Sequence, residues 1–108
     1  MAKAALRVHG PAAVSNAAAT KYTVPANSKF VIRKIHVYNP GTGTVNFTMS
    51  FGTDAAALRI FDAYPVLEDV PLNEYGPYTL EETEIIQAFG SVNNQLVLVI
   101  DGDLYTLG

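Results

Sequence analysis

The chain has 108 residues, the size of a single domain, and its hydrophobic fraction of 49% is sufficient for a folded core. It has no cysteine, which excludes disulfide bonds, thiolate metal ligands and a cysteine nucleophile. Residues 1–53 carry six basic and no acidic side chains, whereas residues 54–108 carry one basic and ten acidic ones. Such scattered basic residues beside so many acids make a poor track for nucleic-acid phosphates.

The uneven charge allows two interpretations. If strands from the two halves interleave in one domain, the charges neutralise each other inside the subunit. If they do not, the domain has opposite poles that attract neighbouring copies or a partner surface.

The N-terminal segment is Ala-rich and basic, and it lacks the apolar core of a signal peptide. No run of residues approaches the ~18 apolar residues that a membrane span needs. We therefore expect a protein made in a cytoplasm, with neither secretion by the standard route nor membrane insertion. Residues 1–19 are expected to form an arm outside the folded domain, which begins at residue 20.

Short runs rich in β-branched and aromatic residues alternate with Gly, Pro and Asn turns, a pattern typical of a sandwich or barrel. In chain order the expected strands are Ala5–Val8, Lys21–Val24, Lys29–Tyr38, Thr44–Phe51, Leu58–Tyr64, Val66–Val70, Tyr78–Leu80, Ile85–Phe89, Gln95–Asp101 and Leu104–Leu107. One helical turn is expected after Asp54, a suitable N-cap.

Three of these strands have informative patterns. Thr44–Phe51 alternates strictly between apolar and polar residues, as a half-buried antiparallel strand does. Lys29–Tyr38 carries apolar residues on both faces, which predicts that something covers its second face. Gln95–Asp101 is apolar on both faces like a central strand, and the following Asp101-Gly102-Asp103 is expected to be a hairpin turn.

Eight or nine strands formed from these candidate segments in about 100 residues predict an all-β fold, a two-sheet antiparallel sandwich with jelly-roll-like topology. An immunoglobulin-like sandwich is the alternative, but the chain lacks the cysteines and tryptophan that mark it.

Catalytic and metal-binding patterns are weak. His9 and His36 lie on unrelated segments without ligand spacing, and the acidic run Glu81–Glu84 fits a solvated turn better than a carboxylate pair across a cleft. We therefore expect no enzyme activity, no cofactor and no metal. The six tyrosines are more suggestive, because exposed loop tyrosines often anchor protein interfaces.

Four short sequence segments carry a resemblance to a known group of proteins. They are Tyr22–Ala26, Ile35–Asn39, Gly76–Leu80 and the strand Leu96–Gly102. Together they resemble small virion structural proteins of tailed bacteriophages, similar to head decoration (cement) proteins. Glu81-Glu82-Thr83-Glu84 stands where that group would have Glu-Ala-Gly-Asp, and residues 1–20 have no recognised counterpart.

The resemblance implies a non-enzymatic virion protein that binds the outside of a capsid, as a homotrimer, and stabilises the head. Its partners would be the major capsid protein or other virion subunits, with no nucleic acid or membrane. The residues expected at the interface are Lys3, Arg7, Arg33, Tyr75 and Tyr78. Two alternatives are a tail, baseplate or fibre module that binds host glycans through loop tyrosines, and a small enzyme on a cupin-like barrel.

Overall fold

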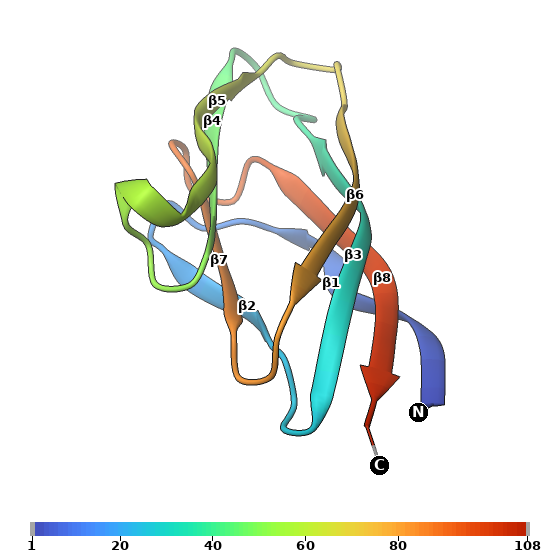
Figure 1. Cartoon of the computed structure of the whole chain (residues 1–108). Coiled ribbons are helices and arrows are strands. Elements are labelled where there is room, and N and C mark those ends of the chain that lie inside the picture. Colours follow the sequence, from blue (N-terminus) through green and yellow to red (C-terminus); the bar gives the residue numbers. More distant parts are fainter. Residues whose placement is uncertain (1, 108) are drawn as a thin grey trace.

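The structure is a computed structural model that describes residues 2–107. Eight strands and one short 3-10 turn follow one another along the chain (Figure 1). Their bounds are β1 (Ala2–Ala13), β2 (Ala19–Thr23), β3 (Ser28–Tyr38), β4 (Val45–Phe51), η1 (Ala56–Leu58), β5 (Arg59–Val66), β6 (Leu72–Leu80), β7 (Ile85–Gly90) and β8 (Val97–Thr106). Within the described residues, no helix is long and apolar enough to span a membrane.

The strands form two antiparallel four-stranded sheets that pack face to face. Sheet A has the order β1-β8-β3-β6 and sheet B the order β2-β7-β4-β5. Successive strands alternate between the sheets, except for β4 and β5, which pair with each other in sheet B; this is the topology of a jelly roll. The predicted β-sandwich is therefore confirmed.

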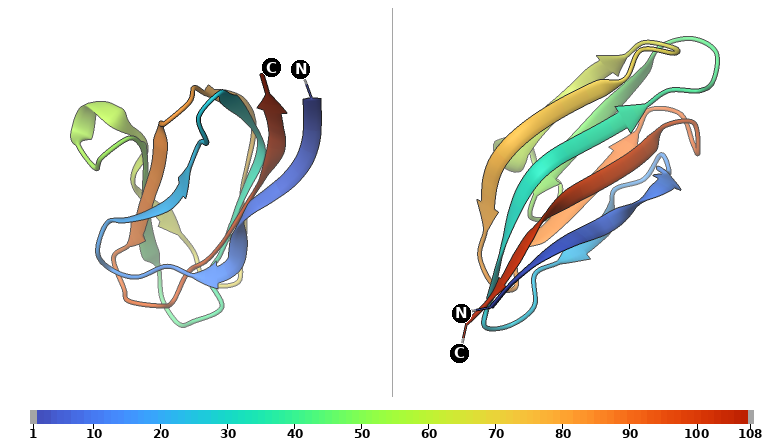
Figure 2. Two further views of the ribbon diagram at one scale, coloured as in Figure 1. Left: turned by 90° about the horizontal axis from the view of Figure 1, so that it is seen from below. Right: turned by 90° about the vertical axis from the view of Figure 1, so that its right-hand side faces the viewer.

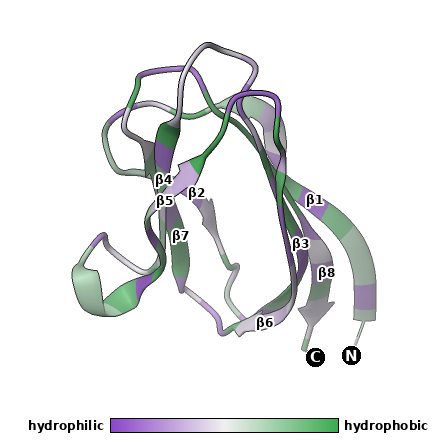
Figure 3. Ribbon diagram, turned by 90° about the horizontal axis from the view of Figure 1, so that it is seen from above, coloured by the Kyte–Doolittle hydropathy of each residue, from purple (hydrophilic) through white to green (hydrophobic). Residues whose placement is uncertain are grey.

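The core lies between the two sheets and is formed by alternate residues of the strands. Phe30 and Ile32 of sheet A and Phe47 and Met49 of sheet B are all fully buried. Figure 3 shows alternation of this kind as bands of hydrophobic and hydrophilic residues along the ribbon of β1. Burying a large apolar side chain stabilises a fold by about 1.5–3 kcal/mol, so this layer supplies most of the driving force.

A bulge in strand β3 shows why the prediction of a second apolar face on Lys29–Tyr38 was wrong. The ladders of β3 with β6 and β8 shift register between Ile32 and Lys34, which places a bulge at Arg33. A bulge adds one residue and reverses the alternation of faces beyond it. Ile32 and Ile35 therefore both face the core, and the second apolar face that seemed to need a cover does not exist.

The Asp101-Gly102-Asp103 segment is a second correction, because it lies inside β8 and not in a hairpin turn. A Cβ on Gly102 would collide with the carbonyl oxygen of Val31 and with the ring of Phe30. Glycine is thus required here by the close approach of β8 to β3. The two flanking aspartates point to the outer face of sheet A.

The N-terminal segment also differs from its prediction. Residues 2–13, inside the expected arm 1–19, form β1 and pair with β8, and Val14 is fully buried in the core. Most of the segment is therefore a strand of the sandwich. Its weak apolar pattern reflects its position at the edge of sheet A, where most of its side chains are exposed.

The middle of the chain contains two further differences. The expected strand over residues 66–70 is mostly a turn, and β6 begins at Leu72, well before the expected start at Tyr78. The expected helical turn exists as η1, but Asp54 does not cap it. The Asp54 carboxylate instead accepts two hydrogen bonds from Arg59, of 2.9 and 3.1 Å.

Asn39 joins the loops at one end of the sandwich. It is fully buried, and its Nδ2 donates to the carbonyl oxygens of Gly43 and Val66 at 2.8 and 3.0 Å. Its Oδ1 accepts from the backbone N–H of Gly41 and from Nε2 of Gln95. One side chain thus fixes the β3–β4 turn against the end of β5 and the start of β8.

We predict that Asn39→Ala lowers the free energy of unfolding by about 2 kcal/mol, because it leaves buried carbonyl groups without donors. Urea denaturation followed by circular dichroism measures the change. Asn93→Ala, in an exposed loop with one backbone hydrogen bond of 3.3 Å, is the matched control and should cost less than about 0.5 kcal/mol. Equal losses in the two variants would contradict this role.

Candidate interaction surface

The outer face of sheet A gathers four of the five residues expected at an interface. Lys3 and Arg7 come from β1, Arg33 from the bulge of β3 and Tyr75 from β6. The register of β1 against β8 places Lys3 opposite Tyr105 and Arg7 opposite Asp101. The fold thus collects on one surface residues that are up to 72 positions apart in the sequence.

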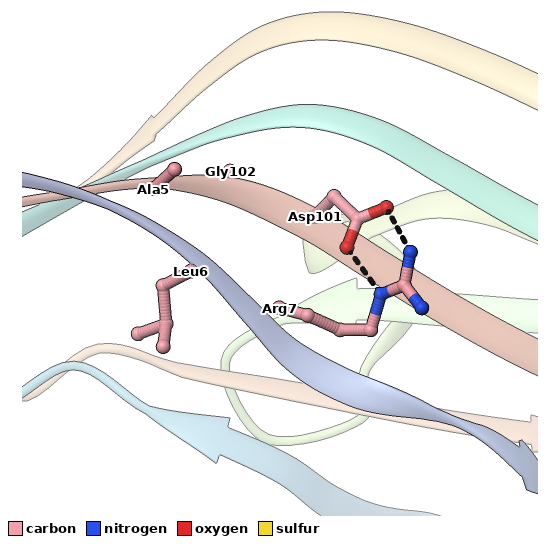
Figure 4. Close-up of a pocket in the computed structure, with 5 residues that line it drawn as sticks. All are labelled: Ala5, Leu6, Arg7, Asp101 and Gly102. Carbon is pink, nitrogen blue, oxygen red and sulfur yellow. Dashed lines mark hydrogen bonds and ion pairs between the residues drawn. The ribbon is translucent and has the colours of Figure 1, made fainter.

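Ion pairs cross this face from strand to strand. Asp101 accepts two hydrogen bonds from Arg7, of 2.7 and 3.2 Å, and Figure 4 shows the two side chains facing each other while Leu6 points away. Asp103 lies 2.9 Å from Nε of Arg33 and 3.9 Å from Nζ of Lys3. These hydrogen bonds raise the pKa of Arg7 and of Arg33, so both side chains stay charged throughout the accessible pH range.

These contacts show that part of the uneven charge is neutralised within the subunit. Lys3, Arg7 and Arg33 pair with the aspartates of β8, and Lys29 pairs with Glu81 at 3.4 Å. Four of the six basic residues of the first half are thus neutralised by acids of the second half within the subunit. The jelly roll produces this result because it inserts β8 between β1 and β3.

Tyr75 and Tyr78, the two tyrosines expected at an interface, lie on opposite faces of β6. Tyr75 has 64% of its surface exposed, and Nζ of Lys34 lies 5.6 Å from its ring centroid. Tyr78 instead faces the core, where its ring meets Phe51 edge-on at 5.6 Å between centroids. Strand alternation separates residues three apart, so Tyr78 is not on the outer surface of sheet A.

Sequence reasoning missed a second exposed group, which lies between β5 and β6. Tyr64, Leu67 and Val70 have 46%, 52% and 52% of their surface exposed. Together with Pro65 and Pro71 they border a hollow of about 140 Å³. The two prolines that bracket residues 66–70 were a signal for an exposed loop, because proline interrupts strand pairing.

The histidines do not form a site. Among residues 2–107 no group of three His, Asp or Glu side chains is arranged to hold a metal. His36 makes a 2.6 Å hydrogen bond with Asn73 on the outer face of sheet A. His9 is partly buried on β1, its Nε2 has no hydrogen-bond partner in the described part of the chain, and burial lowers its pKa, with a smaller contribution from Lys21.

No family model and no curated protein matches the chain. Among solved structures it is similar to a Bacillus endospore appendage protein from a structure described as a family of disulfide-linked pili. The TM-score is 0.53 at 15% sequence identity, over 99% of this chain and 87% of the other. At this identity the similarity shows a shared fold alone.

The buried His9 predicts a pH dependence of stability. The pKa of His9 in the folded state lies below the unfolded value near 6.5. The contribution of neutral His9 to the free energy of unfolding is therefore complete above about pH 6.5 and is lost as the pH falls through the folded pKa. His9→Gln should therefore flatten the decrease in unfolding free energy between about pH 7.5 and pH 5. His36→Gln, which leaves His9 in place, should retain it; equal slopes for His9→Gln and the wild type would refute the assignment.

Proposed function

We propose that this chain is a non-enzymatic structural subunit that works by packing against other protein subunits. The outer face of sheet A carries the proposal. It combines exposed basic groups with an exposed tyrosine, and these are residue types enriched in the centres of protein interfaces. Ion pairs between its strands hold this face in one arrangement before any partner arrives, which reduces the entropy cost of docking.

The more specific form of the proposal is a head decoration protein of a tailed bacteriophage. The resemblance of Tyr22–Ala26 and Gly76–Leu80 to virion structural proteins supports it. In that role Tyr75 and Arg33 would contact the capsid exterior, and several weak contacts would combine through avidity if the protein assembles as a trimer. The structural neighbour belongs to pili, which are also assembled from subunits, but this chain has no cysteine for a disulfide link.

The glycan-binding tail module has less support. It needs Tyr75 and Tyr78 on one platform, and the two rings lie on opposite faces of β6. Only Tyr75 remains available to stack on a sugar from that surface.

Co-sedimentation with empty heads of the virus that encodes the chain tests the proposal. We expect saturable binding that Tyr75→Ala weakens about tenfold, because exposed aromatic residues are frequent hot spots. Tyr64→Ala removes a half-exposed tyrosine from sheet B and is the matched control. Absence of binding, or equal loss in both variants, would contradict docking through sheet A.

The experiment should use point variants of the full chain. Deleting residues 2–19 would remove β1 and the buried Val14, so lost binding could not be separated from lost folding. Circular dichroism spectra matching the wild type confirm that each variant is folded.

A further inference from the structure

The jelly roll leaves four strand edges on two opposite flanks. Strands β1 and β2 end sheets A and B on one flank, and β6 and β5 end them on the other, as the right view of Figure 2 shows. We call residues 2–23 the basic flank and residues 59–80 the acidic flank. An unprotected edge exposes unpaired backbone groups and is a potential site of association.

The apolar surface is concentrated on the acidic flank. Of the eight exposed large hydrophobic residues among positions 2–107, four lie there, namely Tyr64, Leu67, Val70 and Tyr75. The basic flank contributes Leu6, which is 38% exposed and faces away from the Arg7–Asp101 pair (Figure 4). Exposed apolar groups gathered in this way mark contact sites.

The charges of the two flanks are complementary. The basic flank carries Lys3, Arg7 and Lys21 and no acid, whereas the acidic flank carries Asp62, Glu68, Asp69 and Glu74 beside the single base Arg59. Lys3, Arg7 and Arg59 are already paired within the subunit, with Asp103, Asp101 and Asp54 respectively. Within residues 2–107, Lys21 and the exposed Glu68 are in no ion pair, so each flank keeps charge of its own sign.

Strand direction permits contact between the two flanks. Sheet A has four strands, all antiparallel to their neighbours, so β1 and β6 run in opposite directions. A second copy displaced sideways would therefore place its β1 antiparallel to β6 of the first. β1 has no proline from Ala2 to His9, so its outward backbone groups are free to pair.

A symmetric contact between like flanks is less favourable. Antiparallel pairing of β1 with β1 of a second copy about Ala5 would bring Lys3 opposite Arg7 of that copy, and like charges directly opposite destabilise a ladder. Contact between two acidic flanks would likewise bring Glu68 and Asp69 of one copy close to the same residues of the other.

We propose that copies of this chain associate head to tail, the basic flank of one against the acidic flank of the next. Such a contact generates a closed ring or an open filament, according to the rotation between neighbours. The inference rests on the proposed structural role and names a second copy of the chain as one of its partners.

Light scattering coupled to size exclusion tests this with two reversed-charge variants, Lys21→Glu and Glu68→Lys. Each should weaken self-association about tenfold, because reversal replaces an attraction by a repulsion. Mixing the two variants should restore the association that each has partly lost. The reversed basic flank of one variant is then complementary to the reversed acidic flank of the other. Raising the ionic strength from about 0.01 M to about 1 M should weaken assembly of the wild type, since the Debye length falls from about 30 to about 3 Å.

Lys29→Glu on β3, whose exposed ion pair is with Glu81, and Glu84→Lys in the β6–β7 turn carry the same charge changes outside both flanks and should associate like the wild type. A wild type that is monomeric at every concentration and ionic strength overturns the inference, as does a mixture that fails to recover. Head binding by a monomeric wild type would leave the proposed function standing, whereas assembly without head binding would refute the proposed function alone.

Discussion

The packing of two apolar sheet faces against each other is the constraint on which the rest of this structure depends. Phe30 and Ile35 in sheet A and Phe47 and Met49 in sheet B have no exposed surface, and in β3 the chain departs from regular geometry where a regular strand would turn Ile35 outward. This departure is the bulge at Arg33. It interrupts the β3 ladders, yet it returns Ile35 and Val37 to the core, and burying two such side chains is worth more than the disturbed hydrogen bonding.

The same constraint explains the charged outer surface. The jelly-roll order places β8 between β1 and β3, so the last strand of the chain lies between two early ones. Gly102 permits that close approach, and Asp101 and Asp103 beside it then face the basic side chains of both neighbours. Exposed ion pairs contribute about 0–1 kcal/mol each, so they are better understood as setting the charge and order of the surface than as holding the fold together.

The sequence predicted the sandwich but only part of the candidate surface, for physical reasons. The alternation in β4 could be read directly, because its ladder with β7 is regular and the register shifts against β5 come from extra residues in β5. Thr48 and Ser50 on its polar face are nevertheless buried, so the expectation of a half-buried strand was wrong. The bulge in β3 and the strand through Asp101-Gly102-Asp103 could not, since each depends on a neighbouring strand that is distant in sequence. Lys3, Arg7 and Arg33 were chosen for their charge, and their meeting with the β8 aspartates follows from topology, which local pattern does not contain. Tyr78 was misplaced because its strand, β6, was expected to be a loop as far as Pro77.

The four sheet edges are not equally available for contact, and this difference links the fold to the proposed role. Pro65 in β5 and Pro77 in β6 each remove a backbone donor from an edge, and β2 has only five residues. The first half of β1 is longer, free of proline and joined to the sandwich through β8 alone. Natural sheets usually protect such an edge, and in the first half of β1 Lys3 and Arg7 do so, by excluding strands that carry like charge. An edge that repels its own kind while remaining open to an acidic partner is suited to directed assembly and resists indiscriminate aggregation.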